Sequence, residues 1–303
     1  MLFVYSNSIT EAVVLKENGK YYFYPEQIEW IKEQTAKARE DGQMMVAMCH
    51  YPIIPGQPLF SIISQMVIRD AHKFAHFLAD EGVHILFTGH MHNQSINFIE
   101  TEKGNKLYDI TTGSIIADPA FIRLVTIKDK DTVEIKSIAT PDFEWDTKGK
   151  TCKEYLSDMF DRMIVNVLTD MRDDTIRMMN KFHLEDKGST KKILGLAGKL
   201  ICSIKVGTLA RMLFLKCDKS VRKIRVLDYA TELVRGIFEG NQTFKEGTPK
   251  GDVFVALLKR IRPILRKIEV KGWDGKTVDL YDVLKNTAGN YGIDDYNATI
   301  KLN

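Results

Sequence analysis

Two short apolar runs constrain the fold of this chain more than any other part of its sequence. The first, MMVAMCH, covers residues 44–50, and the second, HILFTGH, covers residues 84–90. Uninterrupted apolar runs of this length that stop abruptly are typical of strands buried on both faces of a sheet. Because a helix is predicted between them, over about 68–81, we expect both strands to lie in one open α/β sheet.

The segments around these strands extend the same layered pattern. Two hairpin-like pieces open the chain, and Asn18-Gly19 has the composition of the tight turn in the second piece. Pro25 is expected to start a helix over 25–41, and strands alternate with turns over 95–139. These elements predict a layered α/β sandwich whose functional loops follow the strand ends.

The sequence changes character near residue 150. From Cys152 onward, long helical periodicity replaces the short strands. Residues 1–150 carry 15 Lys and Arg against 20 Asp and Glu, whereas residues 151–303 carry 28 against 20. A length of 303 residues suits two domains. We therefore predict an α/β domain over 1–148 and a mainly α-helical domain over 149–303.

Composition narrows the class of protein. A hydrophobic fraction of 44% and a charged fraction of 27% are those of a globular chain, which excludes disordered and collagen-like classes. The four cysteines form no C-x-x-C pair, so neither a zinc knuckle nor a disulfide framework is indicated. The opening residues lack the basic region of a signal peptide. Reduced thiols in a cytoplasmic protein are expected.

Histidines stand at the ends of both predicted strands. Gly89-His90-Met91-His92 directly follows the second strand, and His50 ends the first. Imidazole nitrogens are common ligands for divalent metals, and the carboxyl ends of neighbouring strands meet at one crevice of an open sheet. These residues are therefore candidate metal ligands. The alternative is that each histidine is a structural hydrogen-bonding residue.

A second pair, His72 and His76, lies in the predicted helix over 68–81 with the i, i+4 spacing of some zinc sites. No third ligand and no H-E-x-x-H pattern accompanies the pair. We expect these two histidines to lie on a solvated or partly packed helix face.

The strand-end motifs resemble those of a known family. Cys49-His50-Tyr51-Pro52 and Gly89-His90-Met91-His92 are similar to the fourth and fifth motifs of the calcineurin-like metallophosphoesterases, and the resemblance covers about residues 1–140. It implies part of a four-layer sandwich, with mixed sheets flanked by helices.

The same resemblance assigns ligands and an activity. It implies that His50 and His90 bind one metal ion and that His92 binds another, in a site for two divalent ions of manganese, iron or zinc. The implied reaction is hydrolysis of a phosphoester substrate by a phosphatase or phosphodiesterase. Asn93 follows the last ligand and is a candidate for bracing an imidazole or binding substrate, with a plain turn as the alternative.

The first three motifs of that family, D-x-H, G-D and G-N-H, are absent from credible positions. Their letters occur at 70–72 and 251–252, inside predicted helical segments. Three neutral imidazoles supply no carboxylate to bridge two ions, so we expect this chain alone to bind at most one ion, weakly. We also expect the runs at 44–50 and 84–90 to expose apolar strand edges.

Two functional hypotheses follow from this departure. In the first, the chain is an N-terminally truncated part of a metal-dependent hydrolase. In the second, it is a catalytically inactive module of the same fold whose basic helical domain binds a membrane surface or a protein partner.

The basic character of the helical domain is concentrated in residues 187–225, which carry 11 Lys and Arg and a single acid. Apolar residues are interleaved with these cations, so the segment has the pattern of a surface that binds an anionic membrane or a polyphosphate-bearing partner. The alternative is that its apolar stripe packs on segments 159–168 and 229–238. No base-reading module is present, so we predict no specific nucleic-acid binding. Residues 233–249 are predicted to form an ordered loop between helices, and a loop of this kind could cover the catalytic cleft.

Overall fold

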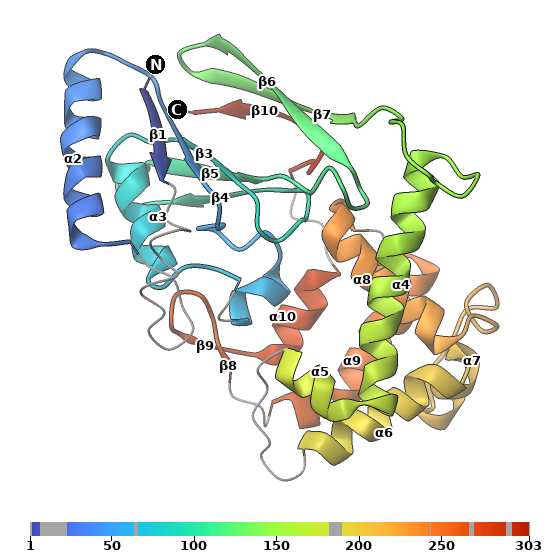
Figure 1. Cartoon of the computed structure of the whole chain (residues 1–303). Helices are drawn as coiled ribbons and strands as arrows, with labels where there is room; N and C mark the ends of the chain where they lie inside the picture. Colours follow the sequence, from blue (N-terminus) through green and yellow to red (C-terminus); the bar gives the residue numbers. More distant parts are fainter. Residues whose placement is uncertain are drawn as a thin grey trace.

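The computed structural model of the chain describes seven stretches of residues: 2–6, 23–63, 66–181, 190–242, 244–266, 270–288 and 293–302. The predicted turn at Asn18-Gly19 lies outside them. The described residues form a mixed α/β structure, in which layered sheets and helices are followed by a group of helices (Figure 1). This is the predicted fold class.

The first sheet has five strands in the order β1-β2-β3-β5-β4. Strands β1, β2, β3 and β5 run parallel, and β4 pairs antiparallel with β5. The strands have these bounds: β1 Leu2–Ser6, β2 Met45–Cys49, β3 Ile85–Thr88, β4 Ser95–Glu100 and β5 Lys106–Thr111. The two apolar runs of the sequence are therefore neighbouring parallel strands.

This arrangement corrects the expectation that the two runs expose apolar strand edges. Strand β2 is paired on both sides, with β1 and β3, and β3 is paired with β2 and β5. The edges of the sheet are β1 and β4 instead. Strand β1 pairs in parallel with β2 along the edge that was expected to be exposed.

Two helices cover one face of this sheet. Helix α2 runs over Pro25–Glu40, with proline in its first turn as predicted, and α3 runs over Ala71–Asp80. The predicted helix start at Ile68 is wrong by three residues, because Asp70 has left-handed backbone with φ 57° and precedes the helix. Alternate residues of β2, such as Ala47, pack with buried residues of these helices.

A second sheet covers the opposite face. It is antiparallel, in the order β10-β7-β6, with bounds β6 Phe121–Asp129, β7 Thr132–Ala139 and β10 Asn297–Lys301. Val46 and Ile110 of the first sheet form one buried cluster with Ile135 and Ile300 of the second. The order of layers is therefore helices, parallel sheet, antiparallel sheet.

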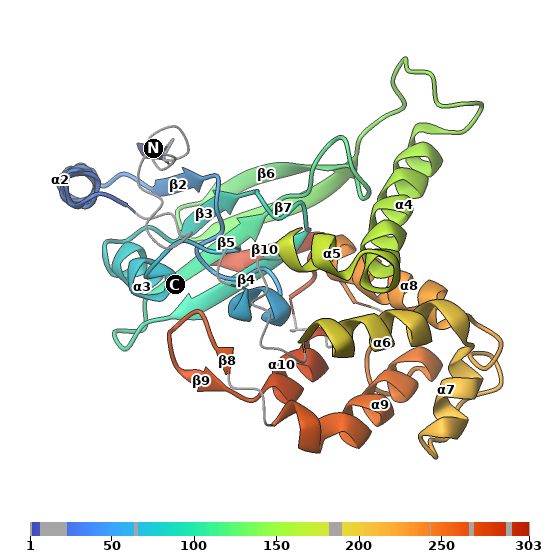
Figure 2. The same ribbon diagram turned by 60° about the horizontal axis from the view of Figure 1, so that its bottom comes forward.

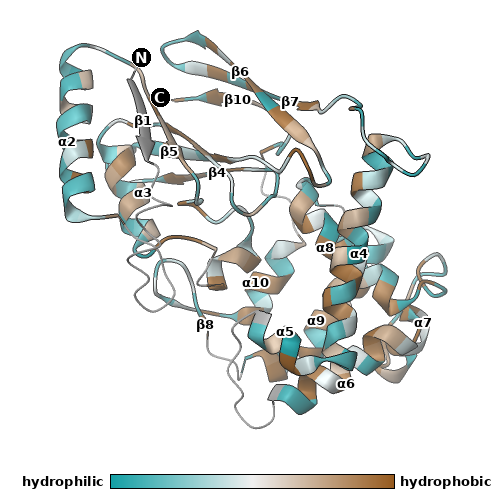
Figure 3. Ribbon diagram, in the orientation of Figure 1, coloured by the Kyte–Doolittle hydropathy of each residue, from teal (hydrophilic) through white to brown (hydrophobic). Residues whose placement is uncertain are grey.

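The outer face of the second sheet carries exposed apolar side chains. Ile122, Leu124 and Ile138 are 46%, 52% and 38% exposed, and apolar colour marks β6 and β7 in Figure 3. In the part of the chain that the structure describes, the sandwich thus has three layers. The fourth layer implied by the family resemblance is not among them.

Helices make up most of the chain after residue 150 (Figure 2). Their bounds are α4 Cys152–Asp173, α5 Thr175–Lys181, α6 Thr190–Ser203, α7 Val206–Met212, α8 Val226–Glu239, α9 Pro249–Leu265 and α10 Leu280–Thr287. A short hairpin, β8 Val270–Lys271 with β9 Thr277–Val278, precedes α10. None of the helices described has the length and apolarity needed to span a bilayer.

Helix α6 packs against α4 and α8. This agrees with the alternative in which the apolar stripe of the basic segment packs on segments 159–168 and 229–238. Gly198 permits the approach, because a Cβ at that position would meet the backbone of Met171 and Arg172 in α4. Part of the apolar stripe remains outside this contact, since Ile193 and Leu196 are 63% and 61% exposed.

The predicted loop over residues 233–249 is partly wrong, because its first seven residues continue α8. Gly236 lies inside α8 and does not end the helix; glycine is required there by packing. A Cβ there would clash with the side chain of Gln242, which is buried beneath the turn that follows α8.

The end of the chain returns to the sheets. Strand β10 pairs with β7, and Asp295 just before it accepts hydrogen bonds from the backbone N–H of Ile96 and Asn241 at 3.0 and 2.8 Å. The side chain of Arg123 donates to the backbone carbonyls of Asp295 and Thr111 at 2.6 and 3.0 Å. These bonds join both sheets to the end of α8.

We predict that β10 is an integral strand of the fold. Ile300 is 3% exposed in the core between the sheets. The substitution Ile300→Ala is expected to lower the free energy of unfolding by about 2–4 kcal/mol through the cavity it leaves. Exposed Thr299 of the same strand is the control, and Thr299→Ala should cost less than about 1 kcal/mol. Urea unfolding measures both, and equal losses would contradict the prediction.

Candidate metal centre

Two of the three predicted ligands meet at the carboxyl ends of β2 and β3. Nδ1 of His90 lies 3.2 Å from Nε2 of His50. The main chains of their loops are also joined, because the N–H of Gly89 donates to the carbonyl of His50 at 3.0 Å. Neighbouring parallel strands thus bring residues 40 positions apart into contact.

The backbone at the second loop is strained. His90 and His92 have φ values of 60° and 55°, in the left-handed region that residues with a Cβ seldom occupy. Gly89, in contrast, is not in that region. The left-handed backbone of His90 and His92 makes the turn. Contacts with neighbouring residues must stabilise this conformation, because it is strained.

The electrostatic environment keeps His90 neutral. Burial, followed by the neighbouring His50 and His92, lowers the pKa of His90 to about 4. Burial and His92 also lower the pKa of His50. The charge of His92 contributes to both shifts, but its own side chain is exposed and does not form a group of three metal ligands with the other two histidines. Neutral imidazole is the form that ligates metal ions.

The ring of Tyr51 packs against the histidine pair. Its ring lies against the ring of His90, with centroids 3.8 Å apart, and it is only 7% exposed. The rings of His50 and His90 meet edge to face at a centroid distance of 5.1 Å. The aromatic contact fixes the plane of His90 and shields one face of it from water.

Asp109 on β5 joins the two loops, and no pattern in the sequence identifies it. Its Oδ2 accepts hydrogen bonds from the backbone N–H of Ile53 and Ile54, at 2.8 and 2.9 Å, in the loop that follows His50. Its Oδ1 accepts one from the hydroxyl of Thr88, at 2.5 Å, just before Gly89. One carboxyl therefore holds both histidine-bearing loops against the same strand.

The Asp109 side chain is 1% exposed. Burial raises its pKa to about 6, and the hydrogen bonds from Thr88, Ile54, Ile53 and Thr111 act in the opposite direction. A desolvated carboxylate is expensive to maintain unless several donors surround it. Those donors are the N–H and hydroxyl groups of the histidine loops.

Asn93, the predicted supporting residue, is fully buried behind the histidines. It faces the loop after His50, since a Cβ at Gly56 would lie 2.6 Å from Nδ2 of Asn93 and 2.7 Å from Oγ of Ser95. Neither side-chain atom of Asn93 has a hydrogen-bond partner among the described residues. Its role in the site stays a prediction.

Gln94 connects the site to the helical part. Its backbone N–H donates to the carbonyl of Phe238 in α8 at 2.9 Å, and its Oε1 accepts from the N–H of Gly113 at 2.7 Å. Met91 packs with Phe60 and with Ile237 of α8. The loop between His90 and β4 is thus held from both sides, a function that no pattern in the sequence marked.

The distance between the ring nitrogens of His50 and His90 is that of a direct hydrogen bond, and it also suits two ligands of one metal ion. Two nitrogens bound to one tetrahedral zinc ion at about 2.0–2.1 Å lie about 3.3 Å apart, close to the 3.2 Å between these two atoms. A two-ion site needs more donors. In the described part of the chain, no group of three or more His, Cys, Asp and Glu side chains is arranged to hold a metal. The residues present fit a single ion and do not fit a bridged pair.

His72 and His76 of α3 form a separate pair. Their ring centroids are 4.4 Å apart, and Trp273 of the β8–β9 hairpin lies 4.9 Å from His72. Burial lowers the pKa of His72. The pair packs partly beneath the hairpin, in agreement with the predicted packed helix face.

Comparison with known proteins adds little to this geometry. No protein family model and no curated protein matches the chain. One solved structure that matches is a dimetal phosphatase from Danio rerio, with 15% identity and a TM-score of 0.31. The match covers 39% of this chain and 36% of that structure. At this TM-score, the two chains have no established common fold.

We predict that Asp109 determines the stability of the histidine loops. In Asp109→Ala, the buried N–H groups of Ile53 and Ile54 lose their acceptor, at a cost of about 1–3 kcal/mol each. Asp109→Asn is the matched control, because its amide oxygen can accept both bonds and should preserve most of the stability. Urea unfolding at pH 7 compares the variants, and equal losses would contradict the role of the acceptor.

The raised pKa of Asp109 should make the free energy of unfolding depend on pH. The folded pKa of Asp109, about 6, exceeds the ordinary value of about 3.9, so the folded state holds a proton that the unfolded state has released. The protonated Asp109 carboxyl therefore adds about 3 kcal/mol to the free energy of unfolding below about pH 4. This stabilisation is lost as the pH rises to about 6. The difference in unfolding free energy between wild type and Asp109→Asn, measured over this range, should show that fall. A flat difference would contradict it.

Proposed function

We propose that this chain is the histidine-bearing part of a calcineurin-like metallophosphoesterase, an enzyme that hydrolyses phosphoesters with the help of divalent metal ions. The observation that carries the proposal is the 3.2 Å approach of His50 and His90 at the ends of two neighbouring parallel strands. The family motifs Cys49–Pro52 and Gly89–His92 are the segments that make this contact.

The chain's own residues define one half of such a site. His50 and His90 would hold one ion, and exposed His92, on the same loop, is a ligand for a second. Bound divalent ions would supply a polarised water and positive charge opposite the phosphoryl oxygens. Tyr51 and Asp109 would position the imidazoles, and the lowered pKa of His90 keeps its ring neutral and available.

The carboxylates of a two-ion site must come from outside the described residues. Bridging carboxylates hold two ions together and compensate their charge, which imidazoles do not do. We therefore propose that D-x-H, G-D and G-N-H segments complete the centre, either in a longer polypeptide or in a second chain. The choice among manganese, iron and zinc depends on those additional ligands.

A metal titration tests the half-site. We expect zinc to bind the chain with a stoichiometry of one, and His90→Ala or His50→Ala to weaken Kd at least about tenfold, which is about 1.4 kcal/mol. His84→Ala is the control, because His84 binds the carbonyl of Lys106 and lies at the other end of β3. Isothermal titration calorimetry at pH 7 measures all four proteins. Equal weakening by His84→Ala would remove the proposed site.

Activity is tested in the completed protein. The reading frame upstream of Met1 is examined for in-frame D-x-H, G-D and G-N-H motifs, and the extended protein is loaded with manganese and assayed on an aryl phosphate and on an aryl phosphodiester. We expect turnover that His90→Ala lowers at least about a hundredfold, since loss of a ligand removes transition-state charge stabilisation. Turnover that is absent, or unchanged in His90→Ala, would favour a catalytically inactive module of this fold.

A further inference from the structure

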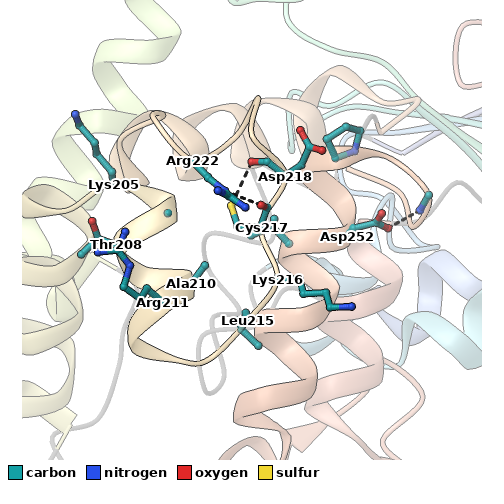
Figure 4. A pocket seen from close by; sticks show the side chains of 14 residues that line it. Lys205, Thr208, Ala210, Arg211, Leu215, Lys216, Cys217, Asp218, Arg222 and Asp252 are labelled. Atoms are coloured by element: carbon teal, nitrogen blue, oxygen red, sulfur yellow. Dashed lines mark hydrogen bonds between the residues drawn. The ribbon is translucent and has the colours of Figure 1, made fainter.

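A cavity of about 920 Å³ lies in the helical part, between α7, the loop over residues 213–225 and the start of α9 (Figure 4). Its volume is that of a site for a small organic ligand rather than for a single inorganic anion. The candidate metal ligands do not contribute to it. Four cationic side chains line the cavity: Lys205, Arg211, Lys216 and Arg222.

Three of these four cations have no acidic partner among the described residues. Within the described residues, the side chains of Lys205, Arg211 and Lys216 form no ion pair. Arg222 donates from Nε to the carbonyl of Cys217 at 2.8 Å, which fixes its guanidinium beside the cavity. The positive charges are therefore available to a ligand.

The two carboxylates in the lining have local roles. Asp218 accepts hydrogen bonds from the N–H and the hydroxyl of Ser220, at 2.8 and 2.6 Å. Asp252 accepts one from the N–H of Gly247 at 2.7 Å. Four cations against two carboxylates give a formal net charge of +2 around the cavity.

Backbone hydrogen bonds join the two ends of the segment that carries the cations. Lys205 and Arg225 form an antiparallel bridge, with Val206 N–H donating to the carbonyl of Ile224 and Val226 N–H donating to that of Ile204, both at 2.9 Å. Gly207 permits this contact, because a Cβ there would lie 2.9 Å from the carbonyl oxygen of Arg222. A preorganised frame lowers the cost of ordering the cations around a ligand.

The lining also restricts the ligand's chemistry. None of the described residues around the cavity is aromatic, so a nucleobase would find no ring to stack on. Cationic side chains on separate elements instead suit an anion with its charge spread over several groups. We propose that this cavity binds a compact, non-aromatic ligand that carries two or more phosphoryl groups.

Two sources can supply that chemistry: a soluble polyphosphate or the phosphorylated headgroup of a lipid. The loop beside the cavity contains Phe214, which is 88% exposed with φ 56°, and Met212 of α7 is 57% exposed. An apolar tip next to a cationic cavity is the arrangement by which a protein inserts into a membrane interface while it holds a headgroup. Phe214 therefore distinguishes the two sources.

The first experiment measures binding of tripolyphosphate to the full chain by isothermal titration calorimetry. We expect a single site that Arg211→Gln/Lys216→Gln weakens at least about tenfold, with weaker binding at higher salt. The matched control is Lys219→Gln/Lys223→Gln, which removes two charges from the same basic loop outside the cavity lining. It should weaken binding less than about threefold.

The second experiment identifies the source. Phosphatidylcholine vesicles with about 5 mol % of a phosphatidylinositol bisphosphate are sedimented with the protein. If the ligand is a headgroup, the vesicles bind, tripolyphosphate competes, and Phe214→Ser lowers vesicle binding without changing tripolyphosphate binding. If the ligand is soluble, tripolyphosphate binds and the vesicles do not.

Circular dichroism and thermal unfolding check that the variants are folded. A measurement on the wild type gives an answer in any case: tripolyphosphate should protect Lys216, and not Lys219, from acetylation by an amine-reactive ester. Absence of binding to both probes at low salt, or equal weakening by the control variant, would overturn the proposal. Equal protection of Lys216 and Lys219 would overturn it as well.

Discussion

The Asp109 carboxyl is the interaction on which the candidate site depends. It accepts hydrogen bonds from the loop after His50 and from the strand that leads to His90, and it is buried within the parallel sheet. Without a common acceptor on β5, the two loops would be joined only by the bond from Gly89 to His50 and by ring contacts. Left-handed backbone at two histidines requires support of this kind, because each such residue stores strain.

A second set of bonds joins the sheets to the helical part. Asp295 accepts N–H groups from β4 and from the turn after α8, and Arg123 reaches carbonyls of both sheets. Burial lowers the pKa of Arg123 to about 10, and the opposing charge of Asp295 is the largest influence that raises it. The loop over His90 and His92 lies between these bonds and the Asp109 network, so its shape depends on both parts of the chain.

The two charged features of the molecule have different origins. At the strand ends, burial lowers the pKa of His90 and keeps its imidazole neutral, which is the form that the proposed metal site requires. In the cavity between α7 and α9, the side chains of Lys205, Arg211 and Lys216 are exposed and form no ion pair among the described residues, and these are the charges that the proposed anionic ligand would contact. A protein that acts on phosphoesters and also binds a polyphosphate ligand would use the two separately, since each is built on its own elements.

The local elements and the candidate ligands are predictable from short stretches of sequence. Apolar runs predicted β2 and β3, proline at position 25 predicted the start of α2, and alternating segments predicted β4 to β7, because each signal depends on neighbouring residues. The histidines were found because they directly follow those runs. The domain division near residue 148 stays a prediction, and the return of β10 to the sheet beside β7 was not foreseen.

The contacts that hold the histidines together depend on long-range packing. Asp109, Tyr51 and Gln94 act through contacts with residues distant in the sequence, and no local pattern distinguishes them from other polar or aromatic residues. The same holds for Gly236 and Gly207, which are required by a side chain and a backbone that approach from other segments. Periodicity fixes which residues lie on a strand or helix, whereas long-range packing fixes which of them meet.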